Sequence, residues 1–335
     1  MSQDTPTASF AGQLTVDDFK RCMAFPVDVP PGTTRMHVDL RFEPLRVAGI
    51  KNKITIALHE PDGTFRGVCI GGSNHKVFDV GLGGAETGFF PGPLPPGRWM
   101  VELDTHMMVP GSTISYSLGV WLSSESQVEV RPRLRFPRPA CRQGPDWYRG
   151  DLHVHTDHSD GHRSVAQLLD TIRQHKLDFV ALTEHNNVTQ LYDPALDGAN
   201  DVAIIPGLEL TTYYGHALSL GTTEWIDWRM GHDGRTMQDA ADEIHARGGL
   251  LVAAHMSNTG DPFCTGCTWL FDRFMPGDLD AVEVWNSPWS WPGNNNGASL
   301  RIWYGWLNAG HRIPATAGSD AHGPYRKDPG FNLIW

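Results

Sequence analysis

The chain has 335 residues and a formal net charge of -11 at pH 7. The length suffices for two domains and a substantial core. The acidic balance disfavours a nucleic-acid substrate, because proteins that bind polyanions usually carry a basic face.

No segment has the composition of a targeting or membrane-spanning sequence. The first residues lack a basic stretch followed by an apolar run, and no later run approaches the length that a bilayer requires. Cysteine is sparse, and its spacing forms no disulfide scaffold in a chain of this length: the five positions are Cys22, Cys69, Cys141, Cys264 and Cys267. We therefore predict a cytoplasmic protein with reduced thiols and no membrane partner.

Residues 1–143 have the pattern of β-strands joined by tight turns. Apolar and polar residues alternate over 36–42, 53–59, 98–104 and 114–120, which is the period of half-buried strands. Turn-forming Pro, Asp and Gly residues separate these runs, and no long helical pattern lies between them. The pattern predicts an all-β antiparallel sandwich that ends in a Pro-rich linker at 131–139.

Residues 144–335 alternate strand-like runs with helical patterns. Val165, Leu168 and Ile172 fall on one helical face after Ser164, and a similar face at 237–244 precedes two glycines. Strands that alternate with helices are typical of βα units. We therefore predict two domains, with the boundary between residues 143 and 144.

Short motifs rich in histidine and carboxylate recur along this second domain. They read D-L-H-V-H at 151–155, T-E-H-N at 183–186, P-G-L-E at 206–209, Y-G-H at 214–216, A-A-H at 253–255 and S-D-A-H at 319–322, with Asp160 after the first. His153 and His155 share one face of a strand, and Asp320 and His322 repeat this spacing. Other motifs follow strand-like runs, whose ends meet at one rim of an α/β barrel.

The chemical nature of these motifs points to divalent metals. Imidazole and carboxylate without a majority of thiolates suit Zn, Mn or Fe. The candidate ligands number more than one metal needs, so we expect two or three metal ions with a bridging carboxylate: the candidates are His153, His155, Asp160, His185, Glu209, His216, His255, Asp320 and His322.

The ordered set of motifs from Tyr148 to His322 resembles that of the PHP (Polymerase and Histidinol Phosphatase) domain of metal-dependent phosphoesterases. The resemblance implies a distorted, incomplete (β/α) barrel with a trinuclear site at its rim. It assigns His153, His155, Glu209 and Asp320 to the first metal, Glu209, His216 and His255 to the second, and Asp160, His185 and His322 to the third. A sandwich ahead of such a barrel is similar to the CehA/McbA-type branch, whose named members hydrolyse aryl carbamate esters.

Metal-activated water makes hydrolysis the expected chemistry. Phosphate esters of small molecules are the first expected substrates, because the wider family that the chain resembles cleaves them. Aryl carbamates or carboxylic esters are the alternative, since the aromatic segment W-N-S-P-W-S-W-P at 285–292 follows a strand and could line an apolar pocket. Packing of the outer core explains these tryptophans equally well. A non-catalytic metal-binding module is a third hypothesis.

Several residues outside the ligand set receive weaker interpretations. His158 and His162 are candidates for protonating the leaving oxygen. Glu184 either orients an imidazole or caps a turn, and Glu283 is given no role. The C-T-G-C motif at 264–267 lacks the second pair of a zinc ribbon, so a structural or substrate-lining loop is expected.

The apolar segment 330–335 is strand-like and follows the last motif. Chains that this one resembles continue further, so we expect either a truncated chain or closure by a partner. An exposed strand favours homo-oligomerisation.

Overall fold

The computed structural model describes residues 5–135, 144–271 and 278–335. The chain divides into two compact units, Met1–Arg133 and Leu134–Trp335. Residues 136–143 lie outside the described residues. They include part of the predicted linker and Cys141, and they end at the domain boundary predicted between residues 143 and 144.

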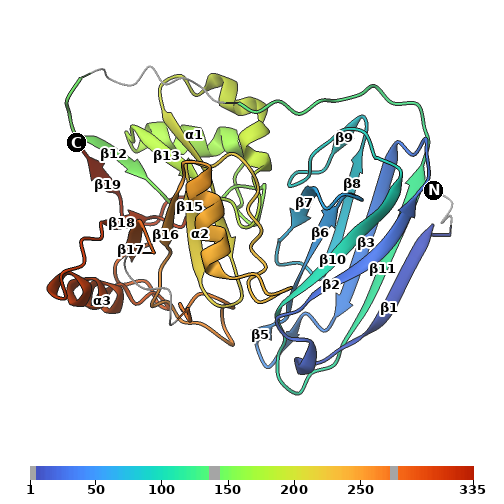
Figure 1. Ribbon diagram of the computed structural model, residues 1–335, viewed down its shortest axis with the longest axis horizontal. Coiled ribbons are helices and arrows are strands. Elements are labelled where there is room, and N and C mark those ends of the chain that lie inside the picture. The colour runs from blue at the N-terminus through green and yellow to red at the C-terminus, as the bar shows by residue number, and fades with distance from the viewer. Residues whose placement is uncertain (1–4, 136–143, 272–277) are drawn as a thin grey trace. The chain divides into compact units, whose positions relative to one another are not determined.

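The first unit is a sandwich of two antiparallel sheets (Figure 1). One sheet has the order β1-β11-β3-β8-β9, with bounds Ala8–Leu14, Ile114–Ser123, Arg35–Glu43, His75–Gly81 and Gly84–Ala85. The other has the order β2-β10-β6-β7, with bounds Cys22–Val29, Gly97–Met107, Lys53–His59 and Phe65–Cys69. Two short strands, β4 (Arg46–Val47) and β5 (Ile50–Lys51), form a separate pair. The four predicted strands correspond to β3, β6, β10 and β11.

Alternating residues from the two sheets fill the sandwich core. Val38, Leu40 and Phe42 of β3 are buried in the same cluster as Val101 and Leu103 of β10. Because side chains on a strand alternate between the two faces, this spacing places one set between the sheets. The predicted antiparallel sandwich is confirmed.

The second unit is built on a mixed sheet of eight strands, in the order β18-β17-β16-β15-β14-β13-β12-β19. The strands in chain order are β12 (Tyr148–Asp151), β13 (Phe179–Leu182), β14 (Ala203–Thr211), β15 (His216–Leu220), β16 (Leu250–Ala253), β17 (Ala281–Asn286), β18 (Ala315–Gly318) and β19 (Asn332–Ile334). Six of them share one direction, whereas β15 and β19 run opposite to their neighbours.

The sheet closes almost completely into a barrel. A parallel bridge joins Val154, beyond the end of β12, to Ala321, beyond the end of β18. Asn332 of β19 links β19 to β18, at the other edge of the sheet. Its side-chain oxygen accepts the backbone N–H of Ala317, and its side-chain nitrogen donates to the carbonyl of Ala317. The distorted, incomplete barrel predicted from the sequence is therefore present.

Three α-helices occur in the described part of the second unit. They are α1 (Val165–Gln174), α2 (Met237–Ala246) and α3 (Asn296–Asn308). Ser164 and Thr236 cap the first two helices, each with a side-chain oxygen that accepts a backbone N–H. The apolar faces predicted for α1 and α2 are buried. Among the described residues, no helix has the length and apolar character needed to span a membrane; the longest, α3, has 13 residues.

Candidate metal centre

The nine predicted ligand residues converge at one rim of the barrel. His153 and His155 follow β12, His185 follows β13 and His255 follows β16. The remaining members come from the turn after β12, from β14, from the start of β15 and from the segment after β18: Asp160, Glu209, His216, Asp320 and His322. Because β15 runs opposite to its neighbours, its first residue lies at the rim where the other strands end.

Four donor atoms surround the first position. His153 Nε2 lies 3.4 Å from Glu209 Oε2 and 3.6 Å from Asp320 Oδ1. His155 Nε2 lies 3.5 Å and 3.0 Å from the same two oxygens. Metal–ligand bonds of about 2.1 Å in a tetrahedral site place neighbouring donors about 3.4 Å apart. The spacing therefore fits donors that share one cation.

Glu209 also faces a second group of donors. Its Oε1 atom lies 3.0 Å from His216 Nδ1 and 3.2 Å from His255 Nε2, whereas Oε2 faces His153 and His155. The two oxygens of the buried Glu209 carboxylate thus face different sets of imidazoles. This arrangement suits a bridging ligand between two metals.

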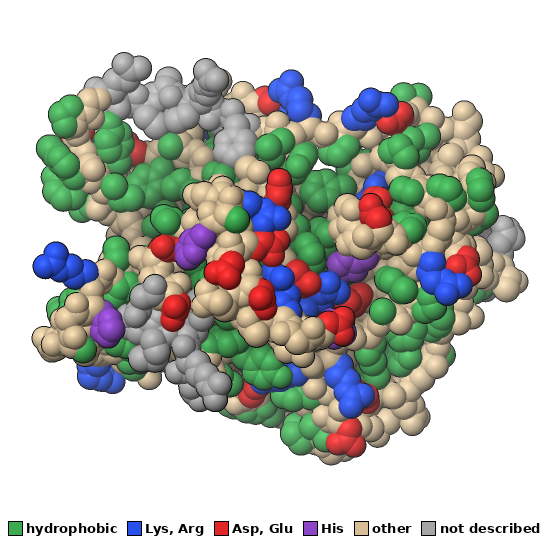
Figure 2. Space-filling view, viewed as in Figure 1, with side chains coloured by type: hydrophobic (Ala, Val, Ile, Leu, Met, Phe, Trp, Pro, Cys, Tyr) green, Lys and Arg blue, Asp and Glu red, His purple; other side chains and the backbone are tan. Residues whose placement is uncertain are grey.

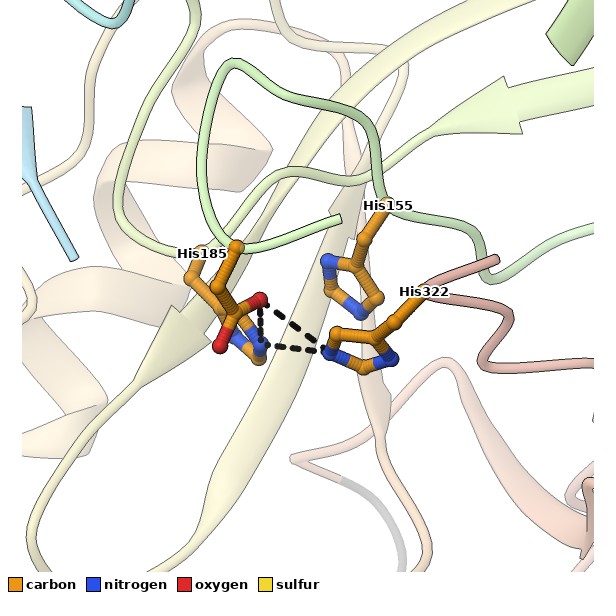
Figure 3. A group of neighbouring side chains, drawn as sticks. His155, His185 and His322 are labelled. Carbon is orange, nitrogen blue, oxygen red and sulfur yellow. Dashed lines mark hydrogen bonds and ion pairs between the residues drawn. The ribbon is translucent and has the colours of Figure 1, made fainter. Parts of the chain in front are cut away.

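The third position is a near-equilateral triangle. His185 Nε2, His322 Nε2 and Asp160 Oδ1 are separated by 3.2–3.3 Å. Figure 3 shows His155, His185 and His322 converging from three separate segments. The His155 ring stacks on both neighbours, with ring centroids 4.1 and 4.2 Å away. One ring nitrogen of His155 lies within 4.8 Å of donor atoms of the other three residues, so His155 can serve this group as well as the first, a sharing that the sequence-based assignment did not include.

Fixed acceptors determine which nitrogen of several rings is available to a metal. Glu283 Oε1 accepts from Nδ1 of His153 at 3.1 Å, the Thr265 carbonyl from Nε2 of His216 at 3.0 Å, and the Asp320 carbonyl from Nδ1 of His322 at 3.0 Å. The other nitrogen of each neutral ring then directs a lone pair at a carboxylate oxygen. Two facing lone pairs require a cation or proton between them, so these residues fit bound divalent metals.

A proton cannot take the place of a metal ion on every imidazole in the group. Burial, together with the neighbouring charges of His185 and His322, lowers the pKa of His155 to about 3. Burial also opposes protonation of His185, but the carboxylates of Asp160 and Glu209 outweigh it and raise its pKa to about 10. At neutral pH the group therefore combines a neutral donor, His155, with a donor whose proton a metal must displace, His185.

Glu283 and Asn286 support the centre, although no role was predicted for either residue. Glu283 accepts from His153 Nδ1 and from the backbone N–H of His255 at 2.9 Å. Asn286 donates to Glu283 at 3.1 Å and to Asp320 Oδ2 at 3.3 Å. Both lie on β17, between β16 and β18, the strands that precede His255 and Asp320. Only the alternation of A-V-E-V-W hinted that Glu283 faces the same rim.

Two further carboxylates hold the ligand-bearing segments. Glu184 accepts from the backbone N–H and hydroxyl of Thr156, at 2.8 and 2.6 Å, and from Ser159. It therefore fixes the turn between His155 and Asp160 and does not bond an imidazole of the cluster directly. Asp151 Oδ1 accepts the backbone N–H groups of His153 and Ser319, which joins the ends of β12 and β18.

The two acid–base candidates lie outside the converging group. Both ring nitrogens of His158 have partners, Thr189 at 2.8 Å and Asp193 at 3.2 Å. His162 is exposed, and its backbone N–H bonds the carbonyl of His322 at 2.6 Å. Of the two, His162 is the exposed one, and its hydrogen bond attaches it to the segment that carries His322.

The C-T-G-C segment departs from the sequence-based expectation. Cys264 and Cys267 form a disulfide, so the prediction of reduced thiols is wrong for this pair, whereas neither Cys22 nor Cys69 is joined in a disulfide. The expected loop is present, since the described residues between β16 and β17 contain no helix. This loop supplies Thr265, the acceptor that fixes His216.

The barrel region also matches a known family. Residues 151–260 match the model of the PHP domain. This PHP region contains seven of the nine candidate ligands, and Asp320 and His322 lie beyond it. The uncharacterized protein MJ1587 of Methanocaldococcus jannaschii is 27% identical over 151 residues, which cover 42% of this chain and 82% of that protein.

Two solved structures show partial likeness. One is a two-domain protein from Bacteroides vulgatus containing a predicted PHP-like metal-dependent phosphoesterase, with a TM-score of 0.40 and 20% identity over 56% of this chain and 57% of that one. The other is a putative metal-dependent phosphoesterase from Bifidobacterium adolescentis, with a TM-score of 0.40 and 17% identity over 54% of this chain and 90% of that one.

Proposed function

We propose that this protein is a metal-dependent hydrolase that acts on small-molecule esters, with phosphate esters as the first substrate class. The observation that carries the proposal is the position of Glu209, whose two buried oxygens face separate sets of imidazoles. A structural zinc site needs four ligands around one ion, whereas a bridging carboxylate is suited to a multinuclear site. The PHP match over residues 151–260 supports the same class of chemistry.

Divalent metals in this centre would supply an activated water and stabilise negative charge on a reacting oxygen. The chain's own residues set where that chemistry can occur. His153, His155 and Glu209 have fully buried side chains, whereas the side chain of His322 is 36% exposed and that of Asp160 is 20% exposed. Substrate therefore enters from the side of the third position.

The backbone of two candidate ligands is held in an uncommon conformation. Asp320 has φ +48° and His255 has φ +30°, values that residues other than glycine rarely adopt. The hydrogen bonds of Asn286 to Asp320 and of Glu283 to the His255 N–H hold these residues in place. Such fixed geometry suits ligands that must keep their orientation while a substrate exchanges. His162, exposed beside His322, is the proposed proton donor to the leaving oxygen.

The charge distribution supports a small substrate rather than a polyanion. On the face drawn in Figure 2, Lys and Arg side chains lie among acidic ones and do not form a continuous basic surface. The net charge of -11 agrees with this view. Extended binding of a nucleic acid would need a row of phosphate contacts.

A specific observation favours aryl carbamates or carboxylic esters as a second candidate class. Trp289 and Trp291, in the segment that follows β17, keep 41% and 40% of their surface exposed. Trp289 lies edge-on to Trp285, and the guanidinium of Arg326 lies 3.6 Å from the centroid of a Trp291 ring. Exposed aromatic rings beside a catalytic rim suit an aromatic leaving group, whereas the stacked Arg326 suits an anionic ester.

A paired assay distinguishes the two classes. The protein is loaded with Mn or Zn, its metal content is determined, and release of nitrophenol from p-nitrophenyl phosphate is compared with release of naphthol from 1-naphthyl N-methylcarbamate. Nitrophenol release that disappears in the His153→Ala/His155→Ala variant is the expected result. Naphthol release alone would reassign the substrate class. Neither product from fully metal-loaded protein would overturn the hydrolase proposal in favour of a metal-binding module.

A further inference from the structure

Residues 256–270, in the loop that follows β16, fold back on themselves and lie against the start of β15. Ser257 and Thr268 form an antiparallel bridge, and the Trp269 N–H donates to the Met256 carbonyl at 2.9 Å. The Leu270 N–H donates to the carbonyl of Tyr214 at 2.7 Å. These bonds anchor the base of the loop, and the C-T-G-C turn lies at its tip.

The tip contacts His216, a candidate ligand of the second position. The Thr265 carbonyl accepts from His216 Nε2 at 3.0 Å, while His216 Nδ1 faces Glu209 Oε1. Gly266 passes so close that an added Cβ would lie 2.0 Å from the Thr212 carbonyl and 2.9 Å from the His216 ring. With φ +77°, this position accepts only glycine without strain.

The disulfide encloses these two contacting residues. Cys264 and Cys267 flank Thr265 and Gly266, and the Cys267 N–H donates to the Cys264 carbonyl at 3.4 Å. A cavity of about 250 Å³ borders Gly260, Gly266 and Thr268, so the turn is not packed on every side. Space is therefore available for the turn to move if the covalent closure is lost.

We propose that the C-T-G-C turn is a positioning element for His216, and that the thiol or disulfide state of Cys264 and Cys267 sets occupancy of the second metal position. The proposal rests on the metal centre of the proposed function. A dithiol reductant breaks the sulfur–sulfur bond, two electrons and two protons pass to the cysteines, and the reductant becomes a disulfide. The Thr265 carbonyl then moves away from Nε2, and Nδ1 of His216 is no longer held toward Glu209.

The other positions do not depend on this turn. Glu283 orients His153, Thr211 Oγ1 bonds His185 Nδ1 at 2.6 Å, and the Asp320 carbonyl orients His322. Reduction is therefore expected to remove about one metal ion per chain and to leave the remainder bound. An orienting partner of a ligand typically contributes about 10–100-fold to metal affinity, which makes the loss measurable at limiting metal.

The test measures metal per chain by mass spectrometry of the elements, in the oxidised protein and after reduction. A phosphine is used because dithiols bind metals themselves; it takes up the oxygen of water, and the two protons pass to the cysteines. We expect the reduced protein and the Cys264→Ser/Cys267→Ser variant to hold about one metal fewer than the oxidised protein, and reoxidation to restore it. Cys69→Ser serves as the matched control and is expected to behave as wild type.

Two further variants separate positioning from general damage. Gly266→Ala keeps both cysteines but displaces the turn, so it is expected to lose the same metal while oxidised. His216→Ala is expected to lose that metal and then to show no further loss on reduction. Equal metal content in oxidised, reduced and double-serine protein would overturn the role of the turn and leave the metal centre intact. Absence of metal in every state would overturn both.

Discussion

Glu283 is the residue on which two candidate ligands depend at once. Three donors point at its carboxylate: His153 Nδ1, the His255 N–H and Asn286 Nδ2. A carboxylate can accept all three, because it has two oxygens and no hydrogen. Its effect is to fix which nitrogen of His153 carries a proton and where the His255 backbone lies.

The Glu283→Gln variant is expected to weaken metal binding by about 10–100-fold. Glutamine keeps the size of the side chain, but its amide nitrogen would face a donor, because one oxygen cannot accept from both sides of the residue. Competition with a fluorescent chelator measures the change. Glu243→Gln is the matched control, since Glu243 lies on α2 and pairs with Arg235 and Arg247. Wild-type affinity in Glu283→Gln would show that the carboxylate does not orient the ligands.

At the residue scale, the sequence predicted the metal ligands better than the residues that orient them. The spacing of His153 with His155 and of Asp320 with His322 identified residues that the structure does bring together. Asn286 and Thr265 could not be found in this way, because each acts through a contact between segments distant in the chain. The disulfide was missed for a related reason: C-x-x-C has the same spacing whether its thiols are reduced or joined.

At the scale of elements, the direction of each strand explains why the ligands meet. Parallel strands bring His185 and His255 to one rim, but the reversed β15 contributes His216 through its first residue. The sequence predicted alternating strands and helices, which implies one direction throughout. No pattern in residues 212–220 indicated that β15 runs antiparallel to β14. The tight turn between the two strands is evident only from the pairing of Thr211 with His216.

Asp151 links the first and last of these strands, and its removal is expected to destabilise the barrel. Asp151→Ala leaves the N–H groups of His153 and Ser319 without their acceptor, at a cost of about 1–3 kcal/mol each. Asp151→Asn keeps one oxygen at that position and is expected to lose less than half as much.

Denaturant unfolding of metal-free protein, followed by tryptophan fluorescence, measures this difference. Ten of the 12 tryptophans lie after residue 134, so the signal reports mainly on the second unit. Equal stability of Asp151→Ala and wild type would show that the two backbone groups find other acceptors and that Asp151 does not hold the strands together.

For the whole molecule, separate cores imply separate responses to metal. The sandwich is held by residues such as Leu40 and Val101, and the barrel by residues such as Leu218 and Val252. All nine candidate ligands belong to the second unit. A metal bound only by the folded barrel therefore adds stability to that unit alone.

Removal of metal by a chelator is expected to lower the melting temperature of the barrel and leave that of the sandwich unchanged. A ligand present at 100 times its dissociation constant stabilises the folded state by about 2.7 kcal/mol. For a unit of this size, that corresponds to a shift of about 5–10 °C. Calorimetry with and without chelator should thus resolve one transition that moves and one that does not.

In the His153→Ala/His155→Ala variant, the chelator should shift neither transition. If both transitions of the wild-type protein move together, the metal stabilises the two units as a single cooperative body, because loss of barrel stability would then be transmitted to the sandwich.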